Sequence, residues 1–336
     1  MLSRVADSLF WMSRYIERAD NLARILDVNV QILLDFAQLD DAHIKEHWDP
    51  ILRSVGRLEQ FEEQYDHANS HTVTEFLTFS RDNPESVVSC LCSARENARM
   101  IRDQISSELW EAINEMYIFL RSASAMQVWE QGAYAFYSRI MRESYLVQGL
   151  MAATFPQDVR NNFFVLGRFL ERAFKVTQIL DTKYHILLPQ VSDVGGAVDT
   201  VQWGAVLKSC SAYEAFHQRY VTQPEPRKII EMLVLSDNFP RSVRFCVTKV
   251  RDILESIAQN SESEGPVKAI AILKELTEEL AGINTEFIVQ KGMHEYLMSI
   301  QDRLNAANDA IFQAYLFRPP VDMENEIALQ QQQQQQ

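Results

Sequence analysis

The chain has 336 residues, of which 47% are hydrophobic, and a formal net charge of −14 at pH 7. This length is typical of two or more domains, and the hydrophobic content is sufficient for sizeable cores. The negative charge argues against nucleic acid and anionic membranes as partners, because both attract basic surfaces.

Helices are the expected secondary structure. Ten Gly and ten Pro are few for a chain of this length, which disfavours an all-β fold. No apolar run is long enough to cross a membrane, so no spanning helix is expected. Asp7 and Arg14 interrupt the apolar residues near the N-terminus, which argues against a secretory signal.

The four cysteines have no paired spacing, which favours a reducing compartment and a cytoplasmic location. Cys90 and Cys246 lie within apolar patterns. We therefore predict that both are small buried hydrophobic residues rather than metal ligands or redox groups.

The first predicted element is one long helix from Ser3 to about Phe36. Apolar residues recur along it at the spacing of a helical face. A polar break is predicted from Leu39 to His43, and a shorter helix from Trp48 to Tyr65. The residues of the apolar face are Leu2, Val5, Leu9, Met12, Ile16, Ala19, Ala23 and Leu26.

Two helix-start signals follow. Thr72 and Glu75 have the spacing of a capping box, which predicts a short helix beginning at Thr72. Asn83 and Pro84 are typical of the cap and the first position of another helix. The helices predicted from there to the middle of the chain are 85–106, 108–121 and 127–153.

Segments of the first part recur in the second. Residues 9–28 match residues 163–182 at eight of twenty positions without a gap. Two further blocks, beginning at Trp48 and Glu75, match residues beginning at Trp203 and Glu231 in the same order. Blocks that recur in the same order, separated by a nearly constant number of residues, indicate an internal duplication. We predict an all-α, internally duplicated helical bundle with two pseudo-symmetric halves of about six helices each, 1–153 and 156–317.

The second half is predicted to repeat the elements of the first. Pro156 opens a helix that ends near Leu188, and Pro240 begins the counterpart of the helix at Pro84. The glutamine-rich tail, 318–336, is predicted to be disordered. The remaining expected elements are a linker at Gly195-Gly196, a helix over 200–220, a break over 223–227, a loop over 259–266, and two more helices ending near Phe317.

A charged cluster is the most unusual feature of the first helix. Arg14, Glu17 and Arg18 share one helical face, and Arg4 and Asp7 project near them. Apolar residues border this face, so we expect the charges to be partly buried and therefore paired or ligand-bound. The cluster is either an ion-pair network or an anion site for a carboxylate or phosphate. The full candidate set is Arg4, Asp7, Arg14, Glu17, Arg18, Arg168, Glu171 and Arg172.

A second polar face is predicted on the helix that begins near Pro84. It is either exposed, with ion pairs between successive turns, or directed towards the charged cluster. Its candidate residues are Arg95, Asn97, Arg99, Arg102 and Asp103.

The sequence contains no motif that identifies a cofactor or a catalytic residue. His43, Glu46 and His47 match the H-x-x-E-H pattern of some zinc peptidases. That segment is polar, and the corresponding positions of the second half have no histidine. We therefore expect no metal and no cofactor, and the catalytic residues are unknown.

Several motifs resemble the alpha-E family, a bacterial all-helical family of unknown function. They are MLSRVADSLFWMSRYIERADNLARILDV at the N-terminus, GRFLERA in the second half, and the helix starts DNPESV and NFPRSV. Such proteins are typically encoded beside an ATP-grasp protein and a transglutaminase-like protein. The resemblance implies both as partners, in a system that forms amide or peptide bonds. The alternatives are an enzyme that binds an anionic substrate at the charged cluster and a structural scaffold that forms homo-oligomers.

Overall fold

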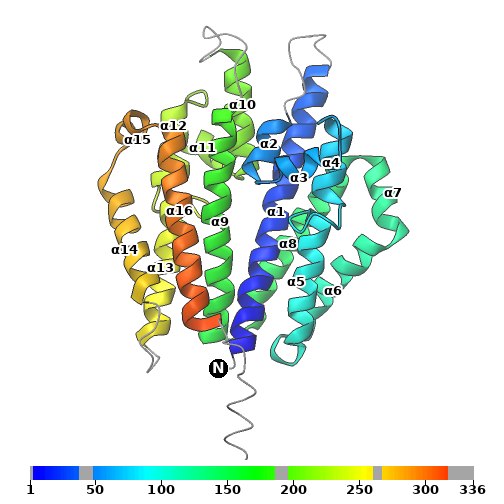
Figure 1. The fold of residues 1–336 in the computed structure, drawn as a ribbon, viewed down its shortest axis with the longest axis vertical. Coiled ribbons are helices and arrows are strands. Elements are labelled where there is room, and N and C mark those ends of the chain that lie inside the picture. Colours follow the sequence, from blue (N-terminus) through cyan, green and yellow to red (C-terminus); the bar gives the residue numbers. More distant parts are fainter. Residues whose placement is uncertain (1–2, 38–47, 186–195, 260–266, 317–336) are drawn as a thin grey trace, which may run out of the picture.

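The computed structural model describes residues 3–37, 48–185, 196–259 and 267–316. Within these ranges the chain contains α-helices and short 3-10 and π turns but no strand, which confirms the predicted all-α class (Figure 1). No helix in the described part is both long and apolar enough to cross a lipid bilayer.

The first half of the described chain contains eight α-helices rather than about six. Along the chain, three short helices lie between the long N-terminal helix and α5 (Val87–Met100) (Figure 1). The helices are α1 (Ser3–Ala37), α2 (Asp49–Ser54), α3 (Leu58–Glu62), α4 (Ser70–Thr78), α5 (Val87–Met100), α6 (Ser107–Arg121), α7 (Ala123–Gln131) and α8 (Ala133–Thr154), with a 3-10 turn η1 (Arg102–Gln104) after α5.

The second half has the same order of long and short elements. Two π turns, η3 (Glu231–Leu235) and η4 (Phe312–Leu316), follow α12 and α16. The helices are α9 (Val159–His185), α10 (Ala197–Ser209), α11 (Tyr213–Arg219), α12 (Pro226–Ile230), α13 (Val243–Gln259), α14 (Val267–Gly282), α15 (Thr285–Lys291) and α16 (Met293–Ile311).

Helices α1 and α9 pack side by side in the centre of the molecule (Figure 1). Helices α5 and α8 flank α1, and α13 and α16 flank α9. Helix α2 packs on α9, whereas α10 packs on α1, so each half contributes a helix to the other. We propose that this parallel arrangement comes from duplication, and the superposition of the two halves stays a prediction.

The central position of α1 follows from its side chains. Leu9, Met12, Ile16 and Leu26 are at most 1% exposed, and Phe10, on another side of the helix, is equally buried. A helix that is apolar on nearly all sides must be surrounded by other elements. The predicted long helix and its burial are therefore confirmed.

One glycine allows α9 to approach α1 closely. A β-carbon at Gly167 would overlap the carbonyl oxygen of Phe10 and the hydroxyl of Ser13. The missing side chain thus lets the two backbones meet, which brings the charged residues of the two helices within reach of one another.

Four predicted helices are divided in the structure. The segment predicted as one helix from Trp48 ends after α2 at Gly56, which has a φ of +67°. Ser211, at a φ of 50°, divides its counterpart into α10 and α11. Gly132 and Gly292, with φ of 147° and 92°, divide the last helix of each half. A positive φ cannot continue a right-handed helix, so each of these residues ends one.

The two predicted helix starts were misplaced by about three residues. Helix α4 is capped by Asn69, whose side chain accepts a hydrogen bond from the amide of Thr72, and Thr72 is the third residue of the helix. Helix α5 is capped by Ser86, because Asn83 accepts from the amide of Glu85 and holds a turn before the helix. Helix α5 also ends at Met100 instead of near residue 106.

Several other predictions lie partly or wholly outside the described residues. These are the break at 39–43, the His43/His47 pattern, the end of the helix predicted to reach Leu188, Gly195, the loop over 260–266 and the glutamine-rich tail. Among the described residues, no group of three or more His, Cys, Asp or Glu side chains is placed to hold a metal ion. Cys90 and Cys246 are fully buried, as predicted.

Candidate functional site

The charged residues predicted on α1 and α9 meet at the interface of these two helices. We use the name central charge network for Arg14, Glu17, Arg18, Arg168, Glu171, Arg172, Glu85 and Arg241. Glu17 and Glu171 are 0% and 1% exposed. The network is therefore inside the protein, as the apolar neighbours of the cluster predicted.

Glu17 and Glu171 each pair with the arginine of the Glu-Arg motif on the opposite helix. Arg18 donates from Nε to Oε1 of Glu171 at 2.6 Å and from Nη2 to Oε2 at 3.0 Å. Arg172 donates to Glu17 in the same two-pronged way, at 2.7 and 2.9 Å. Two parallel N–H···O bonds to a carboxylate are among the strongest side-chain pairs. The two Glu-Arg motifs thus connect the halves of the chain.

The outer partners of the network have opposite charges in the two halves. Glu85 accepts a hydrogen bond from Nη1 of Arg18 at 2.6 Å. In the alignment of the halves, Arg241 occupies the position of Glu85. It donates to Asp20 at 2.8 Å and to Glu17 at 3.4 Å. An inversion of charge at equivalent positions makes the two sides of the network chemically different.

The two remaining arginines differ in how well they are paired. Arg14 donates to Oε2 of Glu171 at 2.7 Å and to Oδ1 of Asn308. Arg168 donates to Gln148 at 3.5 Å, and its buried Nε has no hydrogen-bond partner in the described part of the chain. Burial, followed by the nearby charge of Arg172, lowers the pKa of Arg168 to about 10. Arg168 is therefore the weakest member of the network.

The glutamates are held ionised by their partners. Burial opposes the ionisation of Glu17, but Arg172 and Arg241 outweigh it and lower the pKa of Glu17 to about 2. Burial acts on Glu171 in the same direction, and Arg18 and Arg14 outweigh it, so its pKa is also lowered. Both carboxylates are charged at neutral pH.

A small cavity lies beside Arg18 of the network. The cavity, lined by Arg18, Glu85 and Lys175, has a volume of about 10 Å³, which is at the lower limit for one water molecule. The guanidinium groups of Arg18 and Arg172 already bind carboxylates. This geometry favours the ion-pair interpretation over the anion site at these two arginines.

Arg4 and Asp7 lie nearer the start of α1 than the other candidates. Arg4 is exposed and lines a separate pocket of about 410 Å³ with Asp103, Asp158 and Arg160, between the N-terminal ends of α1 and α9 and the end of α5. Asp7 is partly buried on α1. The candidate set from the sequence therefore divides into a central group of six residues and two residues nearer the N-terminus.

The second predicted polar face has its contacts on α5, η1 and α6. Arg95 and Arg99 both pair with Glu96, at 2.6 and 2.7 Å. Arg102 lies 5.0 Å from the centre of the Trp110 ring. Arg95 also donates to Oδ1 of Asn114 on α6 at 3.3 Å. Asn97 donates to the carbonyl of Ser93, and Asp103 accepts from Gln104.

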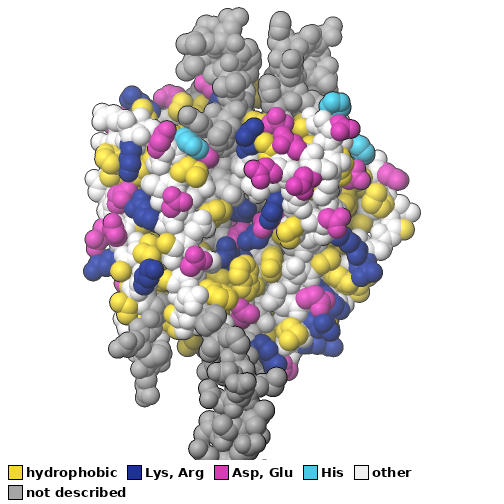
Figure 2. Space-filling model, viewed as in Figure 1, with side chains coloured by type: hydrophobic (Ala, Val, Ile, Leu, Met, Phe, Trp, Pro, Cys, Tyr) yellow, Lys and Arg dark blue, Asp and Glu magenta, His cyan; other side chains and the backbone are white. Residues whose placement is uncertain are grey.

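The surface around this face carries both signs of charge. Figure 2 shows basic side chains gathered over the lower part of α5 and α6, with acidic side chains interspersed across the rest of this view. Interspersed charges of this kind are typical of a solvated protein surface. The five candidates thus form surface ion pairs and local hydrogen bonds.

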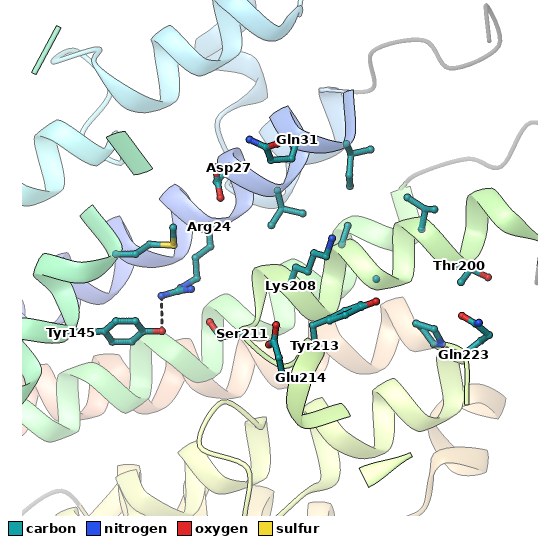
Figure 3. Close-up of a pocket in the computed structure, with 17 residues that line it drawn as sticks. Arg24, Asp27, Gln31, Tyr145, Thr200, Lys208, Ser211, Tyr213, Glu214 and Gln223 are labelled. Atoms are coloured by element: carbon teal, nitrogen blue, oxygen red, sulfur yellow. Dashed lines mark hydrogen bonds between the residues drawn. The ribbon is translucent and has the colours of Figure 1, made fainter. Parts of the chain in front are cut away.

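Sequence reasoning missed a cleft between α1, α8, α10 and α11. Its volume is about 590 Å³ (Figure 3). Asp27 lies in its wall, and it is one of the residues that the two halves share at equivalent positions, as Asp27 and Asp181. That identity was a signal in the sequence, but the cleft itself is formed by helices from both halves. The polar residues of the wall are Arg24, Asp27, Gln31, Tyr145, Thr200, Lys208, Ser211, Tyr213, Glu214 and Gln223.

Comparisons with known proteins place these observations in a family. The sequence model of the Alpha-E family, described as a predicted alpha-helical domain with a conserved ER motif, matches residues 1–316. This chain has the Glu-Arg pair twice, at Glu17-Arg18 and Glu171-Arg172. These are the residues that exchange ion pairs between α1 and α9.

The curated relatives are longer than this chain. An uncharacterized protein of Mycobacterium bovis and one of Mycobacterium tuberculosis are each 22% identical over 333 residues, which covers 92% of this chain and 37% of the relative. The chain therefore spans less than two fifths of the length of the relatives that it matches. No solved structure matches significantly.

Proposed function

The chain belongs to the Alpha-E family, and we propose that it acts as a non-catalytic or co-catalytic partner of an ATP-grasp enzyme that forms amide or peptide bonds. A transglutaminase-like protein is the second proposed partner. Both partners come from the resemblance of the Glu-Arg motifs and helix starts to the family.

The observation that carries the non-catalytic part of this proposal is the pairing inside the central charge network. Glu17 and Glu171 would be the obvious groups for acid–base chemistry, but each is fully buried and bound by two-pronged arginines. Arginine-bound carboxylates with lowered pKa values are poor proton acceptors near neutral pH. The network therefore supports a structural role, in which it fixes α1 against α9.

The length of the relatives supports cooperation with other protein regions. In the mycobacterial proteins the matched region makes up 37% of the polypeptide, so it is joined to a larger part that this chain does not match. In the relatives the matched region is thus attached to another part of the same polypeptide. We infer that this chain acts beside a separate protein in a similar way.

A second candidate function is an enzyme that binds an anionic substrate. The unpartnered Nε of Arg168 favours it, because a buried guanidinium without a carboxylate partner is suited to receive a carboxylate or phosphate. Arg168 has one long hydrogen bond, to Gln148, and the neighbouring Arg18 and Arg172 already bind carboxylates, so we rank this function second.

Reconstitution tests the proposed partnership. The chain is coexpressed with the ATP-grasp protein encoded nearest to its gene, and copurification and ATP turnover are measured with and without the chain. We expect a complex and a turnover that depends on the chain. An ATP-grasp protein that elutes separately and works at the same rate alone would overturn the proposal.

Arg18→Lys tests in the same assay whether the network is architectural or forms an anion site. Lysine keeps the positive charge but loses the planar, two-pronged donor set. If the network is architectural, this variant lowers the melting temperature while the folded protein still supports full ATP turnover. A folded Arg18→Lys protein with reduced turnover would favour the anion site. Arg99→Lys, at a side chain that is 58% exposed, is the matched control.

A further inference from the structure

The cleft between α1, α8, α10 and α11 has the size of a small-molecule site. Its volume of about 590 Å³ is within the range of about 300 to 1,000 Å³ that ligand pockets occupy. Figure 3 shows Arg24, Asp27 and Gln31 on the α1 wall and Lys208, Ser211 and Tyr213 on the facing wall. The two walls come from different halves of the chain, so the cleft exists only in the assembled molecule.

Asp27 is a buried carboxylate without a partner in the described residues. Its side chain lines the cleft, the residue is 9% exposed, and Oδ1 is fully buried with no hydrogen bond. A buried charge without a partner costs several kcal/mol, so such groups are rare unless they bind something. Burial raises the pKa of Asp27 to about 6, against a smaller opposing effect of Arg24.

The nearby cation, Arg24, forms its hydrogen bonds with groups other than Asp27. Arg24 donates from Nε and Nη2 to the two carboxylate oxygens of Asp20, at 3.0 and 2.9 Å. Its Nη2 also donates to the hydroxyl of Tyr145 at 2.8 Å (Figure 3). The equivalent aspartate of the second half, Asp181, is in contrast paired with Nδ1 of His294 at 2.6 Å.

The wall opposite Asp27 carries a positively charged group and a hydroxyl group. Lys208 is exposed and has no carboxylate partner within the described residues, and its Nζ lies 5.4 Å from the centre of the Tyr213 ring. The hydroxyl of Ser211 is buried without a hydrogen-bond partner there. The cleft therefore presents an unpaired carboxylate on one wall and an unpaired ammonium group on the other.

We propose that this cleft binds a small zwitterion of the amino-acid or short-peptide class, whose ammonium group donates to Asp27 and whose carboxylate faces Lys208. An ammonium ion supplies the hydrogen-bond donors and the positive charge that a desolvated carboxylate requires. The tyrosines Tyr145 and Tyr213 provide flat, amphipathic walls on either side. The proposal does not depend on the ligase partnership.

Binding to the full chain, measured by isothermal titration calorimetry, tests the proposal. The probes are the set of L-alanyl-X dipeptides, followed by the N-acetylated and the C-terminally amidated form of the best member. We expect binding in the millimolar range or tighter, and at least about tenfold weaker binding of the N-acetylated form, because it lacks the ammonium donor.

Two variants assign the ends of the ligand. Asp27→Asn is expected to weaken binding of the dipeptide at least about tenfold, and Lys208→Ala to weaken the dipeptide but not its amide. Asp181→Asn is the matched control, and melting curves verify that each variant is folded. No binding by any free-amine dipeptide at millimolar concentration would overturn the proposal. Equal affinity for the acetylated form, or unchanged affinity in folded Asp27→Asn, would overturn it too.

Discussion

Glu17 and Asp27 are buried carboxylates on the same helix, and their surroundings have opposite effects. Glu17 is bound by Arg172 and Arg241, whereas Asp27 has no partner in the described residues. Burial opposes the ionisation of both, but the arginines lower the pKa of Glu17 to about 2 while that of Asp27 is raised to about 6. A buried charge therefore points to a binding site only when no neighbouring group of the protein pairs with it.

The largest effect is expected from Glu17→Gln. The substitution keeps the shape of the side chain but leaves Arg172 and Arg241 buried without their shared carboxylate. Breaking a buried pair in this way costs about 3 to 5 kcal/mol of the free energy of unfolding. Urea denaturation measures it. Glu96→Gln, at an exposed ion pair, is the control, with an expected change below about 1 kcal/mol.

The pH dependence of the same variant gives a second measurement. The pKa of Glu17 is lowered from 4.5 to about 2 in the folded protein. Its contribution to stability is therefore complete above pH 4.5 and is lost as the pH falls towards 2. The difference between wild type and Glu17→Gln should shrink over that interval. A difference that is constant from neutral pH to pH 2 would contradict the assigned ion pairs.

Gly167→Ala tests whether the network depends on the close approach of α1 and α9. The added methyl group would overlap the carbonyl of Phe10 and the hydroxyl of Ser13. We expect a loss of about 1 to 3 kcal/mol in the free energy of unfolding, which is the usual cost of overpacking.

Gly149→Ala is a matched control for this glycine. Gly149 also lies within a helix, α8, but it is exposed and a β-carbon there meets no atom within 4 Å. Alanine is favoured over glycine in a helix by roughly 0.5 to 1 kcal/mol. The control should therefore gain stability. A Gly167→Ala protein as stable as Gly149→Ala would show that the helices are not in tight contact.

Asp27→Asn is expected to stabilise the protein at neutral pH. Removing a carboxylate whose pKa is raised from 3.8 to about 6 gains up to about 3 kcal/mol of unfolding free energy at pH 7. The folded protein binds this proton more tightly than the unfolded chain. The stability of the wild type therefore rises as the pH falls from 6 towards 3.8, and the advantage of the variant disappears.

Other groups around the cleft affect the same measurement. The charged or titratable side chains near Asp27 are Arg24 on α1, Tyr137 and Tyr145 on α8, Lys208 on α10, and Tyr213 and Glu214 on α11. Glu214 is the other carboxylate among the residues that line the cleft. The variant Glu214→Gln, at an exposed residue, therefore serves as the control. An Asp27→Asn protein less stable than wild type at pH 7 would contradict the unpaired state of Asp27.

The sequence predicted the long helices better than their ends. Apolar periodicity was sufficient to predict α1. The predicted and observed ends of α1 and of α6 agree within one residue. The divisions at Gly132 and Gly292 were not predicted. Glycine is tolerated inside helices as well as at their ends, so the residue type alone does not reveal a positive φ.

For the site, the sequence identified the residues but not their partners. The shared face of Arg14, Glu17 and Arg18 was evident from their spacing. Glu85 and Arg241 were missed, although the alignment of the halves places them at equivalent positions. Their contacts arise from packing between distant helices, which no local pattern contains. The cleft around Asp27 was missed for the same reason.

The smallest effect is expected from Arg168→Met, which removes the weakest member of the network. Arg168 has no carboxylate partner among the described residues, and its one hydrogen bond, to Gln148, is long. Methionine keeps much of the side-chain volume and needs no hydrogen bonds. We expect the free energy of unfolding to stay within about 1 kcal/mol of wild type or to rise, because an unpaired buried charge is removed. Arg14→Met should cost more, because Glu171 loses a donor at 2.7 Å.

Inorganic phosphate turns this small effect into a test of the anion site. A ligand that binds the folded protein raises its melting temperature in proportion to the logarithm of its concentration above the dissociation constant. If Arg168 receives an anion, phosphate stabilises the wild type and loses that effect in Arg168→Met, with sulfate behaving similarly and chloride at equal ionic strength as the control. We expect phosphate to act equally on both proteins, because Arg168 is partly buried and lies beside Gln148 and the positive charge of Arg172. A phosphate effect that disappears with Arg168 would make the charge network, rather than the cleft at Asp27, the first ligand site of this molecule.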